Sequence, residues 1–135
     1  MIVLDASALL AYLFRETGHE IVEQYIEDAC ISTVNLSEVV GRFIRDGIDV
    51  TPLIQHLEKT SIEIVPFNQE HALHAAELIP LTKPYGLLLG DRACLGLAST
   101  RNLAILTADV VWAEIEGLDL EIIPVRRKKC LYFKM

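Results

Sequence analysis

Short apolar runs alternate along this chain with longer segments whose apolar residues recur at helical spacing, and this alternation constrains the fold more than any other feature. The run Ile2-Val3-Leu4 contains no polar residue, which is typical of a strand buried on both faces. Such strands, separated by helical segments, build parallel sheets covered by helices. The sequence therefore predicts an α/β fold, an α/β/α sandwich whose central parallel sheet has four to five strands.

The same patterns place the individual elements. Strands are predicted at residues 2–4, 30–32, 62–65, 103–106 and 120–123, the last of them ended by Pro124. Helices are predicted at residues 6–15, 19–28, 36–46, 51–59, 69–79, 91–100 and 109–116. Residues 80–89 contain two prolines and Gly86 and are predicted to form a loop. A chain of 135 residues suits one core, so residues 1–135 are expected to form a single domain.

Composition excludes several classes of protein. A hydrophobic content of 52% is too high for a disordered chain, and a net charge of −7 disfavours non-specific binding to polyanions. The three cysteines form no Cys-x-x-Cys pair, which excludes a thiolate zinc site and a disulfide framework and predicts a reducing, cytoplasmic location. No apolar run reaches the roughly 18 residues of a membrane span, and Asp5 interrupts the apolar start of the chain. We therefore expect no contact with a membrane.

Four acidic residues lie where predicted strands end or the following helices begin: Asp5, Glu38, Asp91 and Asp109. Ligand sites in parallel sheets lie beyond the carboxyl ends of the strands, so these side chains are expected at one edge of the sheet. Each also suits a structural role, because Asp is a preferred helix N-cap and Asn35 with Glu38 has the spacing of a capping box. Capping alone does not require acids, however, since Ser, Thr or Asn would cap without adding charge.

Four carboxylates at one edge would repel one another and raise one another's pKa. A hard divalent cation removes that conflict, because Mg²⁺ and Mn²⁺ prefer oxygen ligands. The pattern therefore predicts a site for Mg²⁺ or Mn²⁺, and whether it holds one ion or two stays open.

Four motifs resemble the PIN domain family, and in particular the VapC-like toxins of toxin–antitoxin pairs. They are residues 3–9 (VLDASAL), 34–39 (VNLSEV), 89–93 (LGDRA) and 106–109 (LTAD). Each motif is short, but their order and spacing are specific, and the resemblance covers roughly residues 1–125. It implies a parallel sheet between helices and a metal-dependent ribonuclease that leaves a 5′-phosphate and a 3′-hydroxyl.

The resemblance also implies roles for individual residues. The four acids match the quartet that holds Mg²⁺ or Mn²⁺, with Asp5 and Asp91 as the principal direct ligands and Glu38 and Asp109 binding directly or through water. Ser7 and Thr107 match polar positions that orient carboxylates or water from behind the ligands. Asn35 is expected to contact the site or to cap its helix.

Partners follow from the resemblance and from the charge pattern. The substrate is expected to be RNA, and the run Arg126-Arg127-Lys128-Lys129 gathers positive charge that either steers RNA or only aids solubility. Arg92 is expected to contact phosphate or to pair with a neighbouring carboxylate, the latter being favoured. The acid-rich segment 16–28 is either a solvated helix face or a surface for a basic partner. The family implies a cognate antitoxin and a homodimer.

Other functions remain as alternatives. A non-catalytic PIN-fold interaction module would keep the fold, and a receiver-like signalling domain would also carry acids at strand ends. The receiver needs a phosphoacceptor Asp on a middle strand and a late Lys, and neither has a good candidate. A haloacid-dehalogenase-like phosphatase needs a second Asp where Ser7 stands. His71 and His74 have helical spacing, but no third zinc ligand is evident.

Overall fold

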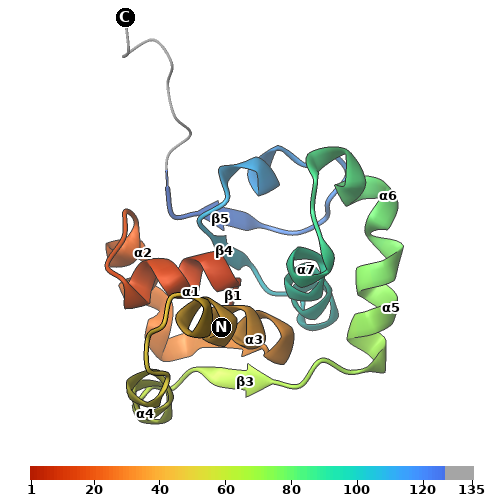
Figure 1. Cartoon of the computed structure of the whole chain (residues 1–135). Helices are drawn as coiled ribbons and strands as arrows, with labels where there is room; N and C mark the ends of the chain where they lie inside the picture. The colour runs from red at the N-terminus through yellow and green to blue at the C-terminus, as the bar shows by residue number, and fades with distance from the viewer. Residues whose placement is uncertain (127–135) are drawn as a thin grey trace, which may run out of the picture.

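The computed structural model describes residues 1–126, which form a five-stranded sheet between two layers of helices (Figure 1). The strands are β1 (Ile2–Leu4), β2 (Ala29–Ser32), β3 (Glu63–Val65), β4 (Ile105–Thr107) and β5 (Ile122–Pro124). Every pair of neighbours is parallel, in the order β3-β2-β1-β4-β5. The predicted α/β/α sandwich with a parallel sheet is thereby confirmed, and β1 is its central strand.

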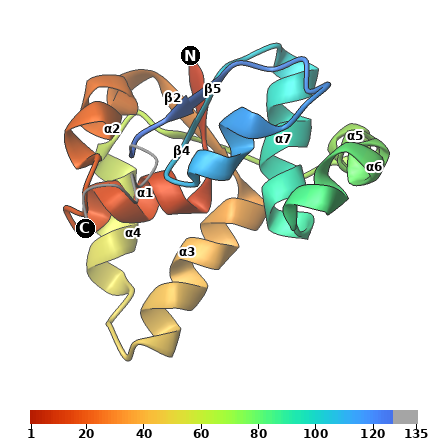
Figure 2. The same cartoon turned by 90° about the horizontal axis from the view of Figure 1, so that it is seen from above.

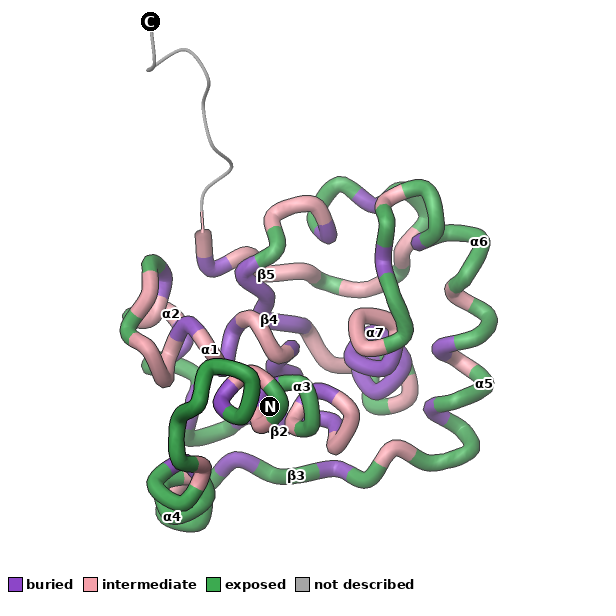
Figure 3. Tube along the Cα trace, in the orientation of Figure 1, coloured by how far each residue is buried: buried purple, intermediate pink, exposed green. Residues whose placement is uncertain are grey.

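The helices divide between the two faces of the sheet (Figure 2). They are α1 (Ala6–Leu13), α2 (His19–Tyr25), α3 (Thr33–Arg45), α4 (Thr51–Lys59), α5 (Gln69–Glu77), α6 (Ile79–Thr82) and α7 (Leu89–Arg101). Leu4 on β1 packs with the side of α1 to α4, whereas its neighbour Val3 packs with α7. Side chains alternate along a strand, so β1 serves both cores and is buried throughout, as are residues 93–98 in the middle of α7 (Figure 3).

Several predicted boundaries are wrong for identifiable reasons. Helix α3 begins at Thr33, three residues before its predicted start, because the Ser32 hydroxyl caps it by accepting a hydrogen bond from Val34 N at 3.2 Å. The predicted loop 80–89 contains all of α6 except its first residue and a 3₁₀ turn at Lys83–Tyr85, since proline is tolerated in the first turn of a helix. Residues Val110–Glu114 form a 3₁₀ helix within the predicted α-helix 109–116.

The last two strands also differ from prediction. Both start two residues later than expected, and β5 includes Pro124, which is paired with Thr107. Proline is compatible with this position because β5 lies at the edge of the sheet. Within residues 1–126, no helix is long and apolar enough to cross a membrane.

Gly18 immediately precedes α2 and lies against the backbone of Val125, the residue after β5. Its φ is +96°, and a Cβ at this position would overlap the Val125 carbonyl oxygen and lie 2.9 Å from the Val125 carbonyl carbon. We expect Gly18→Ala to lower the free energy of unfolding in urea by about 2 kcal/mol, from left-handed strain and backbone overlap together. Gly47→Ala is the matched control, since its φ is +70° but no atom lies within 4 Å of its Cβ. Equal losses in the two variants would contradict the overlap.

Candidate metal centre

The site begins at the carboxyl ends of β1 and β4, which are neighbours in the sheet. Asp5 directly follows β1, and its backbone N–H donates to the Leu106 carbonyl at 3.2 Å. Asp109 lies two residues beyond β4. The topology therefore brings the first and last acids of the predicted quartet to the same edge of the sheet, although about a hundred residues separate them in the chain.

Asp5 is a buried carboxylate held on both oxygens. Its Oδ1 accepts from Ala8 N at 2.8 Å and from the Ser7 hydroxyl at 2.8 Å, while its Oδ2 accepts from the Thr107 hydroxyl at 2.6 Å. The pKa of Asp5 is raised to about 6, mainly by burial and to a smaller extent by the nearby Asp91, against the lowering effect of these hydrogen bonds. The residue therefore caps α1, as the capping alternative predicts. Its charged form is nevertheless buried, which lowers the stability of the folded protein.

The Ser7 and Thr107 hydroxyls connect Asp5 to the backbone that directly follows the neighbouring strand β4. The Ser7 hydroxyl accepts from Ala108 N at 2.9 Å, and the Thr107 hydroxyl accepts from Asp109 N at 3.0 Å. Each hydroxyl thus has a backbone donor on one side, which directs its own proton toward the Asp5 carboxylate. Both hydroxyls therefore contact the Asp5 carboxylate directly.

Glu38 lies in the second turn of α3, not in its first turn, because the helix begins at Thr33. The predicted capping box of Asn35 and Glu38 is therefore wrong. Asn35 is inside the helix, only 1% exposed, and its Nδ2 donates to Glu38 Oε1 and to the Gly90 carbonyl oxygen, each at 2.9 Å. Glu38 has no capping role, so helix capping does not account for an acid at this position.

Asp91 and Asp109 both act as caps in addition to lying at the site. Asp91 is the third residue of α7, and its Oδ2 accepts from Leu88 N at 2.9 Å. Asp109 precedes the 3₁₀ helix Val110–Glu114 and accepts from Val111 N at 3.1 Å. Burial raises the pKa of Asp91, and the negative charge of Asp109 adds to this effect. These two carboxylates are thus close enough to interact.

The pKa of Cys94 responds to three of the four acids. This thiol is fully buried on α7, and its pKa is raised well above the ordinary value, first by burial and then by the fields of Asp5, Asp91 and Glu38, among others. Together with the interaction of Asp91 and Asp109, this links all four acids of the predicted quartet electrostatically. Cys94 itself packs in the core and is not exposed to the site.

The donor set suits a hard divalent cation, since it consists of carboxylate oxygens. The raised pKa values of Asp5 and Asp91 describe carboxylates whose charge is poorly compensated, and a cation would compensate it. The side chain of Asn35 adds a buried Oδ1 that no donor within residues 1–126 satisfies. However, no three His, Cys, Asp or Glu side chains in this part of the chain already stand as a closed ligand group.

Arg92 and Arg126, two of the predicted RNA contacts, bind different parts of the backbone. Arg92 donates to the Ala75 carbonyl oxygen at 3.0 Å instead of pairing with a carboxylate. Arg126 donates to the Thr17 carbonyl at 3.1 Å and lies 3.4 Å from Glu16 Oε1, so it pairs with the acid-rich segment. Arg127 lies outside the described residues, as do Lys128 and Lys129.

The two histidines that suggested a zinc ligand pair have structural contacts. His71 is buried and takes part in the capping box of α5 with Asn68, while the ring of His74 is 3.4 Å from the Ser99 hydroxyl. Gly90 is a residue of the site that sequence analysis did not single out. Its place directly before Asp91 was visible in the sequence, but its contact with Glu38 joins two helices and has no local pattern.

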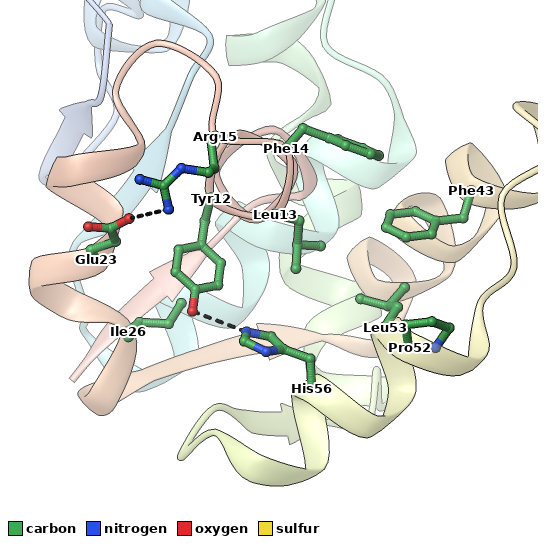
Figure 4. A pocket seen from close by; sticks show the side chains of 10 residues that line it. All are labelled: Tyr12, Leu13, Phe14, Arg15, Glu23, Ile26, Phe43, Pro52, Leu53 and His56. Carbon is green, nitrogen blue, oxygen red and sulfur yellow. Dashed lines mark hydrogen bonds and ion pairs between the residues drawn. The ribbon is translucent and has the colours of Figure 1, made fainter.

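A second feature is a groove between α1 and the α3–α4 hairpin, with a volume of about 500 Å³ (Figure 4). Aromatic and apolar side chains line it, including Phe14 and Phe43, whose ring centroids are 5.2 Å apart, and Leu53. At one end the Tyr12 hydroxyl is 3.1 Å from His56 Nε2. The groove is thus apolar within and polar at its rim, which is the usual character of a binding groove.

Comparison with known families agrees with this architecture. The family model described as the PIN domain matches residues 2–118. The chain therefore belongs to the PIN domain family, which confirms the resemblance seen in its four motifs. No curated protein sequence matches the chain significantly.

Solved structures with the same fold include several toxins. A toxin–antitoxin complex from Klebsiella pneumoniae has a TM-score of 0.69 at 18% identity, covering 95% of this chain and 100% of that chain. DNA-bound VapBC from Salmonella typhimurium has a TM-score of 0.69 at 16% identity, covering 93% and 98%. Mycobacterium tuberculosis VapC20, a sarcin–ricin loop cleaving toxin, has a TM-score of 0.67 at 11% identity, covering 87% and 96%. At these identities the likeness establishes a shared fold.

Proposed function

We propose that this protein is a metal-dependent endoribonuclease that hydrolyses RNA phosphodiester bonds and acts as the toxin of a toxin–antitoxin pair. The observation that carries the proposal is the Asp5 carboxylate. It is buried at the carboxyl end of the central strand β1, and Asp91 is near enough to raise its pKa. Membership of the PIN family and the toxins among the structural neighbours support the same function.

Mg²⁺ or Mn²⁺ would be held by Asp5 and Asp91, with Glu38 and Asp109 binding directly or through water. When bound, such an ion supplies an acidified water as nucleophile and compensates charge on the phosphodiester. The Ser7 and Thr107 hydroxyls fix the orientation of Asp5 through the hydrogen bonds described above, so that its remaining lone pairs face a defined direction. Asn35 holds one oxygen of Glu38 and leaves Oε2 for the ion or its water.

The proposal is tested by incubating the purified protein with a mixed pool of tRNA and rRNA. With Mn²⁺ or Mg²⁺ we expect discrete fragments that carry a 5′-phosphate and a 3′-hydroxyl, and with EDTA we expect intact RNA. Fragments that persist in EDTA would contradict metal dependence. Intact RNA in both conditions, together with calorimetry that detects no Mn²⁺ binding, would favour the alternative of a non-catalytic PIN-fold module. The lack of a closed ligand group within residues 1–126 is the observation in favour of that alternative.

RNA contacts and the assembly state belong to the same proposal. We propose that Arg92 and Arg126 lie along the path of the RNA, together with Arg127. Because Arg126 is already paired with Glu16, its contribution would require that pair to open. A homodimer and a cytoplasmic location complete the proposed description.

We further propose that the apolar groove receives a helix of the antitoxin. Two of the structural neighbours are the toxin–antitoxin complex from Klebsiella pneumoniae and DNA-bound VapBC from Salmonella typhimurium. A groove lined by Phe14, Phe43 and Leu53 with Tyr12 and His56 at its rim fits the apolar face of an amphipathic helix.

The test of the groove is Tyr12→Arg, which places a charge in the groove from a side chain that is only partly buried. We expect it to weaken the complex with the protein encoded beside this chain at least tenfold, measured by calorimetry, because a charge would be buried on binding. The control is Arg45→Glu, an exposed change on α3 outside the groove. Equal affinities of wild type and Tyr12→Arg would contradict this placement.

A further inference from the structure

Gly90 leaves the space that the Glu38 carboxylate occupies. A Cβ at residue 90 would overlap Glu38 Oε2 and lie 2.6 Å from Cδ and 2.7 Å from Oε1. Glycine is not required there by the backbone, because Gly90 lies in the regular helix α7 and its φ is outside the left-handed region. Alanine would be the better helix former at such a position. The close approach of Glu38 therefore accounts for the glycine.

Asn35 holds the same carboxylate from the other side. Its Nδ2 donates to Glu38 Oε1 and to the Gly90 carbonyl oxygen, and the carbonyl is an acceptor only, as is an ionised carboxylate. These two acceptors fix the orientation of the amide, and within residues 1–126 its Oδ1 is left without a donor. A buried Asn with one unsatisfied atom is costly for folding, so what its Nδ2 holds in place is the physical reason for having it.

We propose that Asn35 and Gly90 are positioning residues that fix the Glu38 carboxylate against the first turn of α7, one residue from Asp91. The inference rests on the proposed metal-dependent function. Glu38 has a long, flexible side chain, and holding it before an ion arrives removes the entropy cost of ordering it on binding. Asn35 and Gly90 thereby set the separation of two proposed ligands that come from different helices, α3 and α7.

The test is the Mn²⁺ affinity of Gly90→Ala, measured by calorimetry without RNA. We expect it to fall at least tenfold, because the new methyl group displaces Glu38. The melting temperature in EDTA should not fall, because alanine favours the helix and only a side-chain end has to move. Gly41→Ala is the matched control, a helical glycine in α3 with no atom within 4 Å of its Cβ. Its Mn²⁺ affinity should equal that of wild type.

Two further variants separate positioning from general damage. Glu38→Asp shortens the side chain, so it should weaken Mn²⁺ binding in wild type but strengthen it in the Gly90→Ala background, where it relieves the overlap. Asn35→Leu removes the donor at similar volume and should also weaken Mn²⁺ binding.

If wild type binds Mn²⁺ and both Gly90→Ala and Asn35→Leu bind it equally well, the positioning role is overturned while the proposed nuclease stands. If wild type itself binds no Mn²⁺, the proposed function fails and the positioning role fails with it.

Discussion

Asp91→Asn is expected to lower RNA cleavage by about a thousandfold while the protein stays folded, the upper range for removing one electrostatic group from a catalytic site. The substitution removes a charge that the proposed cation needs but retains an oxygen that can accept from Leu88 N, so the cap of α7 persists. Burial already disfavours the charged form of Asp91, as its raised pKa shows, so the neutral side chain should not destabilise the fold.

The measurement is the initial rate of fragment formation with Mn²⁺, compared at equal concentrations of folded protein. Asp49→Asn is the matched control. Asp49 also accepts a hydrogen bond from a backbone N–H at the start of a helix, that of Thr51 in α4 at 3.0 Å, but its side chain is exposed. It should cleave at the wild-type rate. Cleavage by Asp91→Asn at the wild-type rate would remove Asp91 from the reaction.

Asp5→Asn is expected to have opposite effects on stability and on the response to metal. In EDTA at pH 7.5 the variant should be more stable than wild type by roughly 3 kcal/mol, the equivalent of a pKa raised from 3.8 to about 6 in a residue that is 3% exposed. Asn can still accept from Ala8 N and donate to the Thr107 hydroxyl, so the cap of α1 survives. Mn²⁺ should raise the melting temperature of wild type but not that of the variant.

The pH dependence identifies Asp5 as the source of this difference. The unfolded chain releases the Asp5 proton near the ordinary pKa, whereas the folded protein retains it up to a pH of about 6. Between these values folding takes up a proton, so the unfolding free energy of wild type falls as the pH rises through this range. Asp46 and Glu63, whose pKa values are lowered by arginine partners, act in the opposite direction in both proteins and cancel in the comparison.

Urea unfolding in EDTA from pH 3.5 to pH 7.5 measures this dependence. The two proteins should have similar stability at the acid end and diverge as the pH approaches 6. A difference that is constant across this range would mean that the carboxylate is not the cause, and a less stable variant at pH 7.5 would mean that its hydrogen bonds outweigh its burial.

The fold was largely predictable because its determinants are local. The apolar triplet of β1 and the helical spacing after it depend on residues within a few positions of one another, and α4 was predicted at Thr51–Lys59 as observed. Errors arose where a neighbouring contact decided the boundary. Ser32 caps α3 only because its hydroxyl reaches Val34 N, and Pro124 joins β5 only because that strand lies at the edge.

The candidate site also has a part that local sequence predicts and a part that depends on packing. Because strands of a parallel sheet all point in one direction, an acid at or shortly after the end of a strand lies on a known side of the sheet, and the placement of Asp5 and Asp109 was predicted from sequence on this ground. The site roles of the four acids, of Ser7 and Thr107, and of the basic residues stay predictions until the variants are measured. The interpretation of Asn35 as a cap failed because α3 begins earlier than its pattern indicated.

The alternation of strands and helices, and with it the side of the sheet at which the acids gather, follows from local patterns along the chain. The central place of β1, the burial of Asp5 behind two hydroxyls and the space that Gly90 leaves for Glu38 arise only when the elements pack together. The physical reason is the range of the interactions. Backbone conformation follows from neighbours along the chain, whereas the contact of Asn35 and Glu38 with Gly90 joins residues more than fifty positions apart and exists only once α3 packs on α7.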